Sequence, residues 1–442
     1  MASGTSFTHA FCQSPICTPS RSSFLTGMYP STIRANRNGN ARFETDLPLV
    51  TKLFADAGYV CGNVGKLHLA CAYDAPEARA DDGYTMYAYS HAPRPHGGYD
   101  YMDWVAEKGA SLEDLVTSDD GVPAELHQST WCAKRTIDFI DEAGDTPWLI
   151  TVNPFDPHPP FDPPKDWLAR FDPEGMPGPH FRESDIEAQS ALEPVDFQTK
   201  SRPPGPIATE GATPPSYGGG GALGLHEDVR KLQAAYYAMI GLVDEQFGRI
   251  LAHLDARGLR DDTIVIFTSD HGEMLGDHGL VLKGARFYEG LVRVPLIVSW
   301  PGHVPDGRQS KALVELTDIA PTLLKFADIA VPDHMQGRSL DGVLAGETDA
   351  ASHRDHVRCE YFDAVAMPDG TSATMLRTDR YKLVMYHNHG LGELFDLEAD
   401  PWEHDNLWES HEHRSVKMDL MQRSFDAAIM AMDKGPPRVV PW

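Results

Sequence analysis

Short, almost continuous apolar runs alternate along the chain with longer segments in which apolar residues recur every three or four positions. The runs that predict strands span residues 59–64, 148–152, 263–268 and 294–299. The run at 263–268 is rich in β-branched residues, which is typical of a buried parallel strand. Segment 229–254 carries one apolar stripe and predicts an amphipathic helix capped by Gly258. This alternation indicates an α/β sheet covered by helices on both faces.

Two changes of composition divide the chain further. Residues 172–224 are rich in Pro and Gly, which predicts a long surface excursion, either a flap over a site or a plain flexible loop. Beyond residue 348 come strand-like runs and a helix-like tail, at 373–377, 381–386, 393–397 and 415–432. We therefore expect a large domain over residues 1–348 and a smaller antiparallel-sheet subdomain over residues 349–442.

Polar residues follow two of the predicted strands. Thr268 leads into Ser269-Asp270-His271-Gly272, and the strand at 148–152 leads into a loop that ends at His158. Open α/β sheets bind ligands beyond the carboxyl ends of their strands. We therefore expect the two loops to meet in one crevice.

Charge and cysteine content exclude some classes of function. The net charge is −27, from 65 acidic and 38 basic residues, which argues against nucleic acid as a partner. Six scattered cysteines form no disulfide framework. The sequence has no apolar run of membrane-spanning length, so no membrane span is expected. The N-terminal residues resemble no signal peptide, which by itself predicts a cytoplasmic protein and leaves the localisation open.

Three short segments carry residues suited to catalysis. In Cys17-Thr-Pro-Ser-Arg21, Pro19 suits the first turn of a helix, so Cys17 would lie at a helix N-terminus that stabilises anions. Lys66 and His68 would share one side of the chain if the backbone stays extended. Prolines stiffen the loop around His158. Taken singly, these residues are more often a buried cysteine, solvated side chains or a simple turn.

The motifs together resemble those of the type I sulfatases. Cys17-Thr-Pro-Ser-Arg followed by Leu25-Thr-Gly27 resembles the signature in which the cysteine is oxidised to formylglycine. The family's Gly-Lys-X-His, His-X-Pro-Phe and Asp-Asn/His-Gly elements are similar to residues 65–68, 158–161 and 270–272. Scaffold segments at 287–297, 316–322 and 394–401 extend the likeness over nearly the whole chain.

This resemblance implies an alkaline phosphatase-like α/β/α sandwich with a mostly parallel central sheet and a smaller C-terminal α+β domain. It implies hydrolysis of sulfate monoesters of small molecules or sugars, after a formylglycine-generating enzyme has converted Cys17. The implied catalytic residues are Cys17, Arg21, Lys66, His68, His158 and Lys283. The implied ligands of one divalent metal, Ca²⁺ ahead of Mg²⁺ or Mn²⁺, are Asp270, His271 and position 17.

One element of the family pattern is missing. Family members carry an acidic pair on a strand upstream of the cysteine, whereas residues 1–16 contain no Asp or Glu. We therefore expect the sequence to be part of a longer chain whose upstream segment holds the first strand, two metal ligands and any signal peptide.

Two alternatives stay open. One is a phosphonate monoester or phosphodiester hydrolase of the same superfamily, against which Lys66 and His68 argue because those relatives lack this pair. The other is a non-catalytic binding protein, which the missing acids favour and the other site residues oppose.

Overall fold

The segment before Cys17 forms the strand β1 (Thr5–Phe11), which lies inside a mixed sheet. The computed structural model describes residues 3–43, 45–72, 76–118, 120–195, 229–347, 351–365 and 370–432. In this first sheet β1 pairs antiparallel with β6 (Arg293–Ser299) and parallel with β7 (Arg308–Ser310) and β8 (Val314–Glu315). Strand β5 (Val265–Thr268) lies beyond β6, in the order β5-β6-β1-β7.

The prediction of a parallel strand at residues 263–268 is wrong in its direction. β5 pairs antiparallel with β6, and its residues are half-buried. A parallel crossover usually runs through an α-helix that packs along the sheet. The connection from β5 to β6 contains only the short helices η3 (Asp277–Gly279) and α9 (Glu289–Val292), and β6 returns antiparallel to β5. An apolar run predicts that a strand is sheltered, but it says nothing about the direction of the neighbouring strand.

The second sheet is parallel throughout. It contains β2 (Val60–Gly65) between β3 (Met86–Tyr89) and β4 (Trp148–Asn153). Gly65 is in register with Tyr89 on one side and Asn153 on the other. The three strands therefore end at the same level, and the loops that follow them begin side by side.

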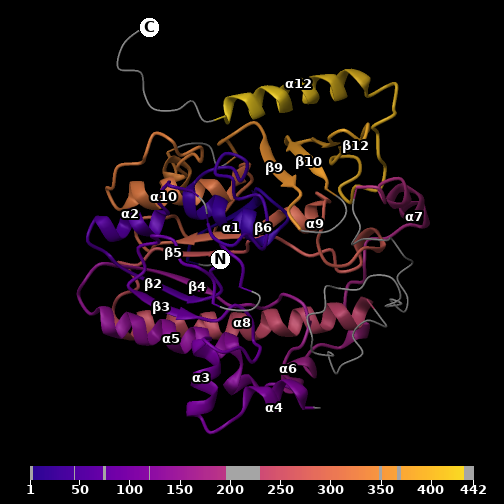
Figure 1. Cartoon of the computed structure of the whole chain (residues 1–442). Helices are drawn as coiled ribbons and strands as arrows, with labels where there is room; N and C mark the ends of the chain where they lie inside the picture. Colours follow the sequence, from indigo (N-terminus) through magenta and orange to yellow (C-terminus); the bar gives the residue numbers. More distant parts are fainter. Residues whose placement is uncertain are drawn as a thin grey trace.

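Helices cover both faces of these sheets (Figure 1). Helices α1 (Cys17–Thr26), α2 (Val50–Asp56) and α10 (Ile319–Phe326) lie on one side, and α5 (Gln128–Ala143) and α8 (Val229–Arg257) lie on the other. The helix predicted at 229–254 is confirmed as α8, and Gly258 follows it with a left-handed φ of 67°. Packing here is close, because a Cβ added at Gly62 of β2 would lie 3.0 Å from the Phe139 ring of α5.

A four-stranded antiparallel sheet follows in the order β12-β11-β10-β9. Its strands are β9 (Val357–Phe362), β10 (Ser372–Arg377), β11 (Tyr381–Tyr386) and β12 (Leu391–Asp396). Helix α12 (Arg414–Met430) packs on this sheet, with Leu420 buried against Leu383 and Leu394. The small antiparallel sheet with a helix is therefore confirmed, whereas β9 had no prediction. The domain boundary at residue 348 stays a prediction.

Shorter helices connect the main elements. They are α3 (Asp100–Glu107), α4 (Leu112–Thr117), α6 (Lys165–Leu168), α7 (Glu183–Ser190) and α11 (Asp341–Leu344). Of the predicted surface excursion, residues 196–224 lie outside the described residues. Among the helices of the described ranges, none combines the length and apolarity that crossing a bilayer requires.

Candidate active site

Cys17 is the first residue of α1, as the sequence predicts. The Asn38 side chain accepts the Thr18 N–H at 2.9 Å and so holds the start of the helix. The Cys17 side chain is only 1% exposed, and its Sγ lies 3.1 Å from Lys283 Nζ and 3.2 Å from His271 Nε2. Burial would raise the pKa of this thiol, but the charges of Lys283 and Lys66 hold the pKa well below its usual value.

Arg21 lies one helical turn after Cys17 and joins three loops. Its Nε donates to Asp270 Oδ2 at 2.8 Å, and its Nη1 donates to the Lys66 carbonyl at 2.8 Å and to Asn153 Oδ1 at 3.3 Å. These contacts connect α1 to the ends of β2, β4 and β5. Burial would raise the pKa of Asp270, but His271 and Arg21 lower the pKa well below its usual range, so the carboxylate is ionised.

Lys66 and His68 both reach this cluster, but not along an extended backbone. His68 has a left-handed φ of 57°, so the condition attached to the sequence prediction is not met. The cause is Glu77, whose carboxylate accepts the backbone N–H groups of His68, Leu69 and Ala70 at 2.9–3.3 Å and bends the chain around itself. Burial lowers the pKa of Lys66 to about 8. Burial, together with Lys66, lowers the pKa of His68 to about 4.

His158 follows β4 and meets the same cysteine. Its Nδ1 lies 2.7 Å from the Pro159 carbonyl, and the ring hydrogen-bonds Cys17. Burial and the charges of Lys283 and Lys66 lower the pKa of His158 to about 3. Phe155 covers this corner, with its ring centroid 4.5 Å from that of His158 and 5.3 Å from Lys66 Nζ.

Asp270, His271 and Cys17 lie at one end of the cluster and present one ligand atom each within 4.8 Å of one another. His271 Nδ1 is 2.8 Å from the Gly272 carbonyl, so its Nε2 faces the cluster. A carboxylate, an imidazole and the group at position 17 fit part of a metal shell. Three donors are fewer than the roughly six that Mg²⁺ or Ca²⁺ takes, so the rest would come from elsewhere.

Comparisons with known proteins identify the family of the chain. A sulfatase family model matches residues 1–329, and a second model, described as N-sulphoglucosamine sulphohydrolase, C-terminal, matches residues 276–428. The chain belongs to the sulfatase family. The sulfatase is 28% identical to an arylsulfatase of Clostridium perfringens, over 98% of this chain and 88% of that protein. It is 36% identical to an N-acetylglucosamine-6-O-sulfatase of Bacteroides thetaiotaomicron, over 42% of this chain and 34% of that protein.

A solved structure supports the fold. A phosphonate monoester hydrolase from Silicibacter pomeroyi superimposes with a TM-score of 0.81, covering 98% of this chain and 90% of that chain at 22% sequence identity. At this identity the likeness concerns the fold alone, and it confirms the predicted alkaline phosphatase-like architecture. Its membership of the sulfatase family makes the protein a sulfuric ester hydrolase, and the family implies a divalent metal and a formylglycine in general terms.

Glu77, Asn153 and His91 are among the residues of the candidate site that the sequence did not predict. Glu77 shapes the Lys66–His68 bend, and Asn153 receives the Arg21 guanidinium. His91, in the loop after β3, packs edge-on against His68 with ring centroids 4.5 Å apart. Its buried Nδ1 has no hydrogen-bond partner among the described residues. Asn153 could have been found from its place at a strand end, but no local motif marks Glu77 or His91.

Proposed function

We propose that the sulfatase removes sulfate from sugars, using a formylglycine that a maturation enzyme makes from Cys17 and a divalent cation, Ca²⁺ first among the candidates. One observation carries the proposal: the side chain of residue 17 is buried between Lys283 and His271 at the N-terminus of α1. Support for a sugar substrate is the likeness to a protein named N-acetylglucosamine-6-O-sulfatase.

Charge is the first requirement of this chemistry, because a sulfate ester is an anion that repels nucleophiles. Lys66, Lys283 and Arg21 bring three cationic side chains to the site, and Asp270 pairs with the arginine. Two ammonium groups therefore stay available for the sulfate oxygens. In a low-dielectric site such fixed charges stabilise a developing negative charge far better than water does.

The two lysines also affect the protonation state of His158. With no sulfate bound, burial and the charges of Lys283 and Lys66 keep His158 neutral, since together they lower its pKa to about 3. A bound sulfate would offset these positive charges and raise the pKa of His158. His158 would thus gain the proton that the departing alcohol needs when the substrate is in place. His68, with a pKa of about 4, is neutral and suited to accept a proton from residue 17.

Asp270 and His271 would hold the metal beside position 17, with Lys283 Nζ 3.1 Å from His271 Nε2. The converted residue would supply an oxygen nucleophile, and a bound cation would add positive charge next to it. Cys17 Sγ stands in for that oxygen-bearing group in the structure.

The test is to co-express the protein with a formylglycine-generating enzyme and to measure its intact mass. We expect an aldehyde at position 17 and hydrolysis of 4-nitrophenyl sulfate. Cys17→Ala should abolish turnover and Cys17→Ser should leave a trace at most, whereas Cys71→Ala, at an exposed cysteine, should be unaffected. Full activity in Cys17→Ala would overturn the proposal, and faster cleavage of phosphonate esters than of any sulfate ester would overturn the substrate class.

A further inference from the structure

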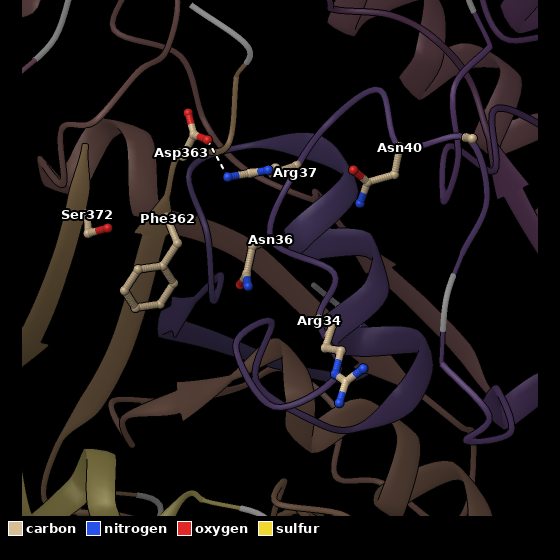
Figure 2. A pocket seen from close by; sticks show the side chains of 8 residues that line it. Arg34, Asn36, Arg37, Asn40, Phe362, Asp363 and Ser372 are labelled. Carbon is tan, nitrogen blue, oxygen red and sulfur yellow. Dashed lines mark ion pairs between the residues drawn. The ribbon is translucent and has the colours of Figure 1, made fainter. Parts of the chain in front are cut away.

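A pocket of about 450 Å³ lies beside the nucleophile helix, between the loop after α1 and the ends of β9 and β10. Figure 2 shows its lining side chains, which include Arg34, Asn36, Arg37, Asn40, Phe362 and Asp363. Its volume falls within the roughly 300–1,000 Å³ of typical small-molecule sites. None of these residues takes part in the proposed catalysis.

Asn38 connects this pocket to the nucleophile. It lies in the middle of the lining loop, accepts the Thr18 N–H at 2.9 Å, and donates its own N–H to the Ala364 carbonyl at 2.8 Å. Thr18 is the neighbour of Cys17, and Ala364 follows the lining residue Asp363. A molecule in the pocket would therefore lie one loop away from the helix that carries the nucleophile.

The charge of the pocket is opposite to that of the molecule as a whole. The protein carries a net charge of −27, yet two arginines line this cavity. Arg37 pairs with Asp363 at 2.5 Å (Figure 2). Arg34 is exposed, no ion pair joins it to an acidic side chain among the described residues, and its backbone has a left-handed φ of 58°. A planar guanidinium suits two-pronged binding of a carboxylate or sulfate.

The remaining lining groups suit a sugar ring. The Asn36 side-chain oxygen is buried and has no hydrogen-bond partner among the described residues, so it requires a donor such as a hydroxyl. The Asn40 amide and the Asp363 carboxylate offer further partners for hydroxyls, and the Phe362 ring offers an apolar face. One ligand class satisfies both the unpaired cation and the unpaired acceptor, namely a sugar that bears an anionic group.

We propose that this pocket binds an acidic residue of the substrate chain, with Arg34 on its carboxylate or second sulfate and Asn36 on a hydroxyl. The inference rests on the proposed action on sugars and extends it to acidic oligosaccharides. It also separates two binding roles. Lys66 and Lys283 bind the sulfate that is removed, and Arg34 binds an anionic group that stays on the product.

The test uses calorimetric binding to the full protein at low ionic strength, so that it does not depend on turnover. The probes are an unsulfated disaccharide with glucuronic acid, an N-sulfated glucosamine disaccharide, and neutral N,N′-diacetylchitobiose. Arg34→Asn removes the charge, and asparagine tolerates the left-handed backbone. Arg34→Lys keeps the charge but removes the planar guanidinium. Arg182→Ala, which removes an arginine from an exposed ion pair with Asp405, is the matched control.

We expect at least one acidic probe to bind wild-type protein more tightly than the neutral probe, and the tighter acidic probe identifies the anionic group. Arg34→Asn should weaken that binding by about tenfold to a hundredfold, the range of one charge-assisted hydrogen bond. The affinity of Arg34→Lys for that probe should lie between those of wild type and Arg34→Asn, and Arg182→Ala should bind it as tightly as wild type.

Equal weakening of acidic and neutral probes, or no change in Arg34→Asn, would overturn the pocket assignment. Absence of 4-nitrophenyl sulfate turnover in the wild-type protein would instead count against the proposed function.

Discussion

Replacing Arg21 by alanine tests whether one buried side chain holds the catalytic loops together. Its guanidinium donates to the Asp270 carboxylate, the Lys66 carbonyl and the Asn153 side chain, all within 3.3 Å. The Arg21 and Asp270 side chains are only 10% and 15% exposed. The change would therefore leave an ionised carboxylate and two acceptors without their donor.

The magnitude follows from the burial of the pair. Removing one partner of a buried ion pair costs about 3–5 kcal/mol, because the charge that remains is uncompensated. Water entering the vacated space would donate hydrogen bonds to the Lys66 carbonyl and the Asn153 side chain and so reduce their cost. We therefore take about 4 kcal/mol as the loss in the free energy of unfolding. One kcal/mol shifts Tm by about 2–4 °C in domains of 150–250 residues and by less in longer chains. We expect Tm to fall by on the order of 5–10 °C.

Calorimetry on wild type and variants measures this shift. Arg182→Ala breaks an exposed ion pair and should change Tm by no more than about 2 °C. The double variant Arg21→Ala/Asp270→Ala should be clearly more stable than the sum of the two single changes predicts, because the two side chains act as a pair. If Arg21→Ala behaves like Arg182→Ala, or if the Arg21 and Asp270 changes are simply additive, Arg21 does not hold the loops together through Asp270.

Three further predictions concern the chemistry. Burial gives Lys66 a pKa of about 8, so kcat/KM should fall as pH rises through about 8 and the ammonium loses its proton. In Lys66→Arg this alkaline limb should move upward, since a guanidinium stays charged, and an unchanged limb in the pH profile would rule the lysine out as its cause. His91→Ala should lower kcat/KM for 4-nitrophenyl sulfate by roughly tenfold through loss of the ring against His68, and His91→Phe should restore most of it. Equal kinetics in the two His91 variants would contradict a packing role. Since Asp270 is the one carboxylate of the Cys17 cluster, calorimetric titration of the chain with Ca²⁺, Mg²⁺ or Mn²⁺ should give Kd values weaker than about 10⁻⁴ M. Asp270→Asn should abolish that binding and Asp120→Asn, at an exposed carboxylate, should not, while nanomolar binding by wild type would refute the estimate.

The sequence predicts the site residues better than it predicts the path of the backbone between them. Local motifs mark Cys17, Arg21, Lys66 and His158, because each motif contains the reacting side chain itself. The bend at His68 could not be predicted, since its cause is a carboxylate nine residues away at Glu77. No pattern in positions 66–70 reveals that three consecutive backbone N–H groups share one acceptor.

The wrong prediction for the direction of β5 has the same cause, since local sequence does not reveal contacts with distant residues. Apolar runs predict β2, β4, β5 and β6 as strands, because hydrophobicity is a property of the residues themselves. The direction of β5 depends on how residues 269–292 return to the sheet, and that path is a property of the whole chain. His91 escaped notice for a related reason. Its importance comes from the imidazole beside it in space, which lies 23 positions earlier in the sequence.

The pairing of β1 has a consequence for the timing of synthesis. Phe11, six residues before Cys17, takes its place in the sheet beside Arg293 and Glu315. A ribosome adds about 5–20 residues per second, so on the order of 15–60 s pass before those partners exist. During this interval the cysteine cannot reach the enclosed position that it occupies in the folded protein. The proposed maturation enzyme would therefore meet Cys17 on the nascent chain, and slower elongation would lengthen the time available for oxidation.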